Sequence, residues 1–222
     1  MVSKLPRWVE YGAFILALIA GCVNAIGLLG FEHQSISHLS GTATLLGTGL
    51  INTSASTAFH LLLILLSFFM GASLSGFLLH GSALKLGRHY DTALLIEALL
   101  LLGSIFLLTQ NLSYGHFLAS AACGLQNALA TTYSGAVVRT THITGIFTDL
   151  GIMLGEKLRG EAFDKRKAIL FLLIISGFIA GGVLGALLFN MLRFYALAVP
   201  AGICLVLSLW YRIYSYRVLK GM

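Results

Sequence analysis

Charged residues are scarce in this sequence, and their scarcity excludes most classes of soluble protein. Only 10% of the 222 residues are charged, whereas 58% are hydrophobic, and the mean hydropathy is +0.91. Soluble domains carry about a quarter charged residues, and a water-soluble core cannot absorb so much apolar surface. The composition therefore predicts an integral membrane protein whose outer surface contacts membrane lipid.

Proline and cysteine are also rare. Two prolines beside 25 glycines are typical of closely packed membrane helices and not of a disordered or collagen-like chain. The three cysteines, Cys22, Cys123 and Cys204, lie inside apolar segments without metal-ligand spacing, so no disulfide framework, metal site or cofactor is predicted. Since no linker or low-complexity stretch interrupts the chain, we expect a single membrane domain over residues 1–222.

Acidic residues are few, with eight Asp and Glu against fourteen Lys and Arg. The basic residues lie in short clusters between apolar runs and not along one continuous face, so nucleic acid is not an expected partner. Clusters of this kind orient membrane helices, because short cytoplasmic loops collect Lys and Arg.

Apolar segments of two lengths alternate along the chain. Two short ones, residues 41–52 and 145–154, reach only about half of a bilayer at roughly 1.5 Å per residue. Six others are long enough for helices that cross about 30 Å of hydrocarbon: residues 11–29, 58–79, 92–109, 116–138, 168–190 and 194–214.

The charge distribution discriminates between two arrangements of the short segments. If both cross the membrane, ten Lys and Arg are cytoplasmic and four are external; if both return to the side they entered from, the count is thirteen against one. The residues that change side are Lys85, Arg88 and Arg139. The positive-inside rule favours the second arrangement. We therefore expect an all-α polytopic membrane protein with six transmembrane helices, two re-entrant or half-length helices, and both termini in the cytoplasm, although spanning short segments remain the alternative.

The two short segments also belong to an internal repeat. Residues 37–47 resemble residues 141–151 at a constant offset of 104, and the Gly-x-x-Asn-Ala motif at residues 21–25 recurs at residues 124–128. Repeat 1 covers about residues 8–109 and repeat 2 about residues 115–214. Because each repeat would hold three spanning helices, the second enters the membrane from the opposite side, which predicts inverted topology and a site near the bilayer midplane.

Each short segment begins with a His-x-Ser/Thr-Gly element. Ser40 and Thr144 are expected at the helix N-caps. Two helix N-termini meeting at the midplane offer free N–H groups, a partial positive charge and imidazole groups to an anionic or carbonyl-bearing solute. The residues of the two elements are His38, Ser40, Gly41, His142, Thr144 and Gly145.

Other polar residues are expected to face the same place, because their side chains are costly to expose to lipid: Asn24, Gln126, Asn127 and Arg139. Asp149 lies seven positions after His142, on the same helical face, and either relays protons or forms a structural pair; Leu45 replaces it in the first half. Glu97 is expected to reach the interface by snorkelling, with a proton relay as the alternative.

The remaining histidines lie at segment ends or in loops and receive no role: His33, His60, His80, His89 and His116. Small residues at helical spacing predict close helix contacts without a chemical role: Gly177, Gly181 and Gly185 on one helix, and Gly71 and Ser75 on its counterpart.

These motifs resemble those of the YoaK-like family of bacterial membrane proteins, also catalogued as domain of unknown function 1275. The resemblance is carried by residues 21–25, 37–42, 124–128 and 139–145, and it covers nearly the whole chain. Asn24 stands where the family usually has Asp, and Thr42 where it usually has Asn, so no role of a carboxylate carries over. The resemblance implies a bacterial inner-membrane location and no established substrate.

Three functions fit the sequence. The leading one is a small-solute transporter or channel with a midplane site, for which an anion is one candidate solute. The second is an intramembrane enzyme that uses His38 and His142 as acid and base or as metal ligands, although the chain lacks His-Glu-x-x-His and Gly-x-Ser-x-Gly motifs. The third is a membrane scaffold with a filled interior and no site. The sequence leaves open whether the chain forms homo-oligomers.

Overall fold

A computed structural model of the chain describes residues 8–30, 38–52, 54–79, 89–134 and 139–220, and these residues form helices joined by short turns, without a strand among them. Its elements are α1 (Trp8–Gly30), α2 (Leu39–Asn52), α3 (Ala55–Leu78), α4 (Tyr90–Thr109), α5 (Tyr114–Ser134), α6 (Ile143–Leu158), α7 (Lys165–Leu192), the 3-10 helix η2 (Arg193–Leu197) and α8 (Ala198–Lys220). Some residues named above lie outside the described ranges: His33, His80, Lys85 and Arg88.

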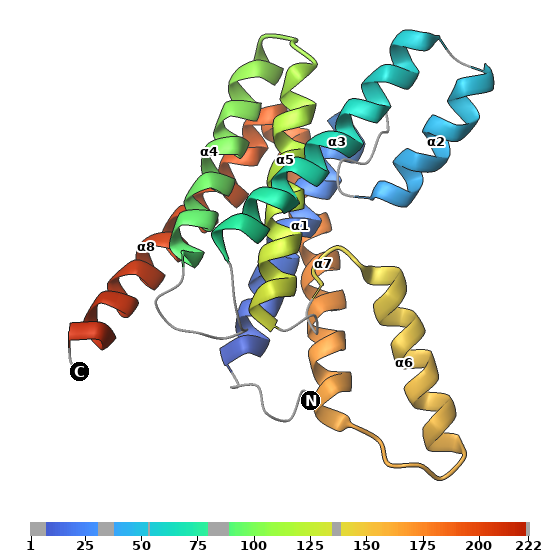
Figure 1. Ribbon diagram of the computed structural model, residues 1–222, viewed down its shortest axis with the longest axis vertical. Coiled ribbons are helices and arrows are strands. Elements are labelled where there is room, and N and C mark those ends of the chain that lie inside the picture. The colour runs from blue at the N-terminus through green and yellow to red at the C-terminus, as the bar shows by residue number, and fades with distance from the viewer. Residues whose placement is uncertain (1–7, 31–37, 53, 80–88, 135–138, 221–222) are drawn as a thin grey trace.

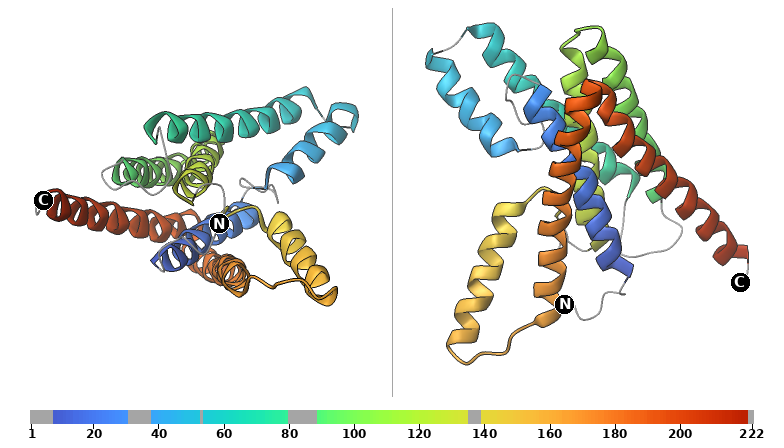
Figure 2. Two further views of the ribbon diagram at one scale, coloured as in Figure 1. Left: turned by 60° about the horizontal axis from the view of Figure 1, so that its bottom comes forward. Right: turned by 180° about the vertical axis from the view of Figure 1, so that it is seen from behind.

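Four helical stretches in the described part of the chain are long and apolar enough to cross a membrane. They are α1, α3, α4 and the continuous run Lys165–Arg217. This run contains α7 and α8, which diverge from η2, where Arg193 adopts a positive φ of 52° (Figure 2). The protein is therefore an all-helical membrane protein. By contrast, α2 has 14 residues and α6 has 16. Both are longer than the predicted short segments, residues 41–52 and 145–154, and at roughly 1.5 Å per residue they reach about 21 and 24 Å.

Helices α1 and α7 are packed so closely that glycines replace larger residues at their interface. A Cβ atom on Gly21 would lie 2.0 Å from the Phe178 carbonyl oxygen, and one on Gly181 would lie 2.0 Å from that of Leu18. Backbones approach this closely only where a Cβ is absent. The predicted packing role of the glycine ridge on α7 is thereby confirmed, since all its members face the α1 backbone: Gly177, Gly181 and Gly185.

Helices α3 and α5 repeat this packing. A Cβ atom on Gly124 would lie 2.0 Å from the Phe68 carbonyl oxygen, and one on Gly71 would lie 1.9 Å from that of Ala121. These contacts match those of the other pair when α1 is shifted by 103 residues onto α5 and α3 by 110 residues onto α7. Each closely packed pair thus joins one helix from the first half of the chain to one from the second.

The short helices lie on one side of this centre, and α4 and α8 lie on the other (Figure 1). In Figure 1, α2 rises from the middle of the molecule to join the upper end of α3, while α6 descends from the middle to join the lower end of α7. The two short helices therefore run in opposite directions, with both N-terminal ends toward the middle.

Candidate functional site

A cavity of about 770 Å³ lies where the N-terminal ends of α2 and α6 approach each other. Helices α1, α3, α5 and α7 and the residues that precede α6 contribute the rest of its wall. Most of the predicted site residues line it, together with several that the sequence did not single out: Asn24, His38, Leu39, Ser40, Phe68, Asn127, Thr131, Arg139, Thr141, His142, Ile143, Thr144 and Phe178.

Most of the lining residues form pairs at equivalent positions of the two halves. The offset is 103 residues for the asparagines, 104 for the residues of the short helices, and 110 for the phenylalanines. The five pairs are Asn24 and Asn127, His38 and His142, Leu39 and Ile143, Ser40 and Thr144, and Phe68 and Phe178. The cavity is therefore built from both halves of the chain, with five lining residues from the first half and eight from the second.

The histidines, and not the hydroxyl residues, cap the two short helices. His142 is the N-cap of α6, and its carbonyl oxygen accepts a hydrogen bond of 3.2 Å from the Ile146 N–H. The His38 carbonyl oxygen likewise accepts the first N–H groups of α2, from Gly41 at 3.0 Å. The expectation that Ser40 and Thr144 are N-caps was wrong by two residues, because each helix starts one residue before its hydroxyl residue.

In each element the glycine leaves room for the histidine ring. A Cβ atom on Gly145 would lie 2.2 Å from Cδ2 of His142, and one on Gly41 would lie 3.3 Å from Cδ2 of His38. The ring thus folds back over the first turn of its own helix. Gly41 and Gly145 act on the cavity through the histidines and do not line it themselves.

The charge of the cavity wall is positive. Arg139 is the charged side chain among the described lining residues, and no carboxylate is found among them. The N-termini of α2 and α6 add partial positive charge. Asn127 contributes a buried Oδ1 atom that has no hydrogen-bond partner in the described part of the protein. Because an amide offers both a donor and an acceptor, this side chain can bind a polar solute.

Two further predicted site residues, besides Gly41 and Gly145, lie outside the cavity wall. Gln126 is buried, with 1% of its surface exposed, and its Nε2 donates a hydrogen bond of 3.1 Å to the Leu16 carbonyl oxygen. It therefore joins α5 to α1. Asp149 faces α7, where its Oδ2 lies 3.9 Å from Nζ of Lys167, and it is about half exposed.

Glu97 was expected at the interface, and this expectation was wrong. Only 2% of the residue is exposed, because its side chain points from α4 toward the bundle interior, beside Cys204 on α8, and its Oε2 atom has no hydrogen-bond partner in the described part of the protein. Sequence reasoning also missed Phe68 and Phe178 as lining residues. In the sequence these two residues are related only by an offset of 110, which differs from the offsets of 103 and 104 in the repeated motifs. The equivalence therefore appears only when α3 and α7 are aligned separately.

The comparisons with known proteins give a family. No curated protein and no solved structure matches this chain significantly. Residues 12–210 match the family described as "Protein of unknown function (DUF1275)", which spans α1 to most of α8. Since the match covers most of the 222 residues, the chain belongs to the DUF1275 family.

Proposed function

We propose that this protein is a transporter or channel that moves a small anionic solute through the cavity between α2 and α6. The observation that carries the proposal is the composition of the cavity wall. Five pairs of equivalent residues line it, and the short helices α2 and α6 both begin at its wall. Transporters with inverted repeats place their binding sites at such interrupted helices near the bilayer midplane.

The proposal includes six spanning helices, with α2 and α6 re-entering from opposite faces. It is supported by the reciprocal glycine contacts, which relate α1 and α7 to α5 and α3. It is also supported by the opposite directions of α2 and α6 (Figure 1). A half that contains three spanning helices reverses the orientation of the half that follows it.

The proposed class of solute follows from the charge of the cavity wall. A cation would meet Arg139 and two positive helix ends without a compensating carboxylate among the described lining residues, whereas an anion would gain from each of them. A volume of about 770 Å³ accommodates a small organic anion or a partly hydrated inorganic one. A scaffold with a filled interior, the third function that fits the sequence, does not provide such a space.

Uptake into liposomes tests the proposal. The purified full-length protein would be reconstituted and assayed with anion-sensitive dyes and a panel of labelled carboxylates and phosphates. We expect at least one anion to enter, and entry to fall at least tenfold in the double variant His38→Ala with His142→Ala. His89→Ala is the matched control, because His89 is an exposed histidine at the start of α4. If no anion in the panel enters, or if the double variant equals the control, the proposal fails.

Labelling of single cysteines tests the topology, which we propose for a bacterial inner membrane. The native cysteines are buried and provide a low background. Ile51 and Leu158 mark the C-terminal ends of α2 and α6, with 85% and 81% of their surfaces exposed. An impermeant maleimide should label Ile51→Cys in intact spheroplasts, and Leu158→Cys only after lysis. Labelling of both from one side would refute the inverted arrangement.

A further inference from the structure

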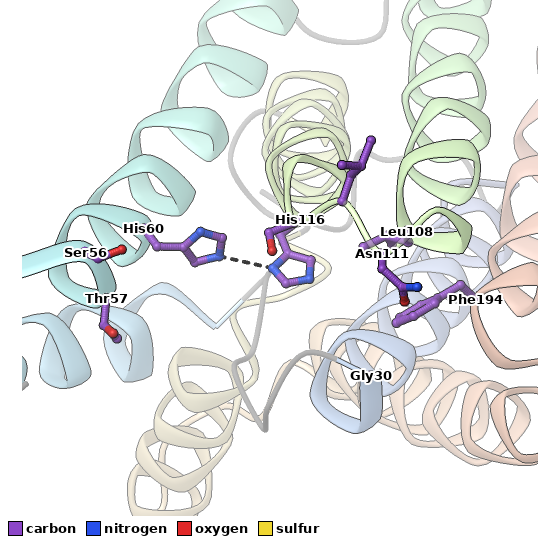
Figure 3. A pocket seen from close by; sticks show the side chains of 10 residues that line it. Gly30, Ser56, Thr57, His60, Leu108, Asn111, His116 and Phe194 are labelled. Carbon is purple, nitrogen blue, oxygen red and sulfur yellow. Dashed lines mark hydrogen bonds between the residues drawn. The ribbon is translucent and has the colours of Figure 1, made fainter. Parts of the chain in front are cut away.

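His60 and His116 form a close pair outside the cavity. His60 lies on α3 and His116 on α5, and their Nε2 and Nδ1 atoms are 3.1 Å apart. Their rings are nearly perpendicular, at 82°, with centroids separated by 5.2 Å. Figure 3 shows the two imidazoles pointing toward each other from the two helices. The two histidines are 56 positions apart in the sequence, so no local spacing pattern indicates that they meet.

The pair borders a separate pocket of about 440 Å³ near the ends of α1 and α4. Along α3, His60 precedes the cavity residue Phe68 by eight positions, or about 12 Å. The lining is mostly polar, with Ser56, Thr57, Asn111 and Ser113 beside the two histidines. Neither a carboxylate nor a thiol is found among the described residues that line it.

We propose that His60 and His116 bind a divalent transition-metal ion of the zinc class. Zinc is held by imidazole nitrogens at about 2.0–2.1 Å, which places two ligands of a tetrahedral ion about 3.3 Å apart. The observed separation is 3.1 Å. Small rotations of the two rings therefore suffice to exchange the shared hydrogen bond for two metal bonds. This inference does not depend on the proposed transport function.

The donor set defines the class of ion. Imidazole suits Zn²⁺, Cu²⁺ and Ni²⁺, whereas Mg²⁺ and Ca²⁺ prefer oxygen ligands and Cu⁺ prefers sulfur. No group of three His, Cys, Asp or Glu is close enough to hold a metal in the described part of the chain. The protein therefore supplies two strong ligands, and water or the oxygens of neighbouring polar groups complete the shell. Such a site is open, unlike a structural zinc site with four protein ligands.

Titration of the chelator-treated, detergent-solubilised protein with ZnCl₂ tests this proposal. Calorimetry should report one Zn²⁺ per chain, and the unfolding temperature should rise with Zn²⁺ because the ion binds the folded state. MgCl₂ should have neither effect. With Cu²⁺, electron paramagnetic resonance should detect nitrogen ligands.

Variants assign the site. His60→Asn and His116→Asn should each weaken Zn²⁺ binding at least tenfold, and the unfolding temperature without metal reports whether each variant folds. The double variant His38→Ala with His142→Ala is the decisive control, because the cavity also holds two histidines. If that variant loses Zn²⁺ while His60→Asn retains it, the ion binds in the cavity and the proposal is overturned. An absence of Zn²⁺ binding to the unaltered protein overturns it as well.

Discussion

Helices α2 and α6 begin with the same element, yet their surroundings differ. Both present a histidine and a hydroxyl residue to the cavity. Helix α6 carries Asp149, which faces Lys167 on α7, whereas α2 has Leu45 at the equivalent position, 45% exposed. Arg139 precedes α6, and serine stands at the corresponding position before α2. The shared residues thus build a symmetric part of the wall, and Arg139 gives the wall charge on one side.

The largest loss of stability is expected at the two glycine contacts that are equivalent in the two halves of the chain. Gly21→Ala and Gly124→Ala each place a Cβ atom 2.0 Å from a backbone oxygen, and overpacking costs about 1–3 kcal/mol or more. The unfolding temperature should fall to a similar degree in both variants, as measured by size-exclusion chromatography after heating.

Gly47 and Gly151 are the matched controls, because they are equivalent to each other and nothing lies within 4 Å of an added Cβ. Replacement by alanine there should be neutral or stabilise the helix by up to about 1 kcal/mol. If only one of Gly21→Ala and Gly124→Ala is destabilising, the two helix pairs are not equivalent.

Replacement of Arg139 tests whether the charge on the α6 side of the cavity wall contributes to anion uptake. Arg139→Gln removes the charged side chain from the cavity wall and should reduce anion uptake about tenfold, which corresponds to about 1.4 kcal/mol. Arg139→Lys should retain part of the uptake. Arg159→Gln is the control, since Arg159 is exposed and pairs with Glu161. Equal uptake by the Gln variants at 139 and 159 would remove Arg139 from the site.

The two glycines beneath the histidines should respond differently. Gly145→Ala would bring a Cβ atom 2.2 Å from Cδ2 of His142 and must displace that ring, whereas the same contact at Gly41 is 3.3 Å. We expect uptake to fall several-fold in Gly145→Ala and to change little in Gly41→Ala. If the two variants lose the same fraction of anion uptake in the liposome assay, the position of the histidine ring over its glycine does not differ between the two halves.

The smallest effect is expected for Asp149. Its contact with Lys167 is long, at 3.9 Å, and both side chains are partly exposed. Exposed pairs contribute about 0–1 kcal/mol, so Asp149→Asn should lower the unfolding temperature by little. A large loss of uptake in this variant, with Leu45→Ala as the control, would instead indicate the proton relay.

The structure brings together polar residues that the local repeats of the sequence had paired. Asn24, Asn127 and the two histidine elements share nearly constant offsets, so the pattern itself pairs them. The N-caps were wrong because hydroxyl preference was used, whereas the backbone carbonyl of each histidine accepts the first helical N–H groups.

Contacts between helices were harder to predict. Glu97 lies near a predicted segment end, where snorkelling is common, but its neighbours are on α8 and could not be identified from periodicity. His60 and His116 meet only because α3 and α5 pack closely. Neither residue lies in a repeated motif, so the sequence contained no signal that joined them.

The interlocked glycine contacts determine which parts of the protein can move as units. The close pairs are α1 with α7 and α3 with α5, so neither sequence repeat is a mechanical body by itself. In an alternating-access cycle, the pair α1–α7 and the pair α3–α5 would rock against each other about the cavity. Helix α6 would move with α7, and α2 would move with α3, because each short helix directly precedes its partner in the chain. Expression of the two repeats as separate fragments would therefore yield chains that fold only when they are made together.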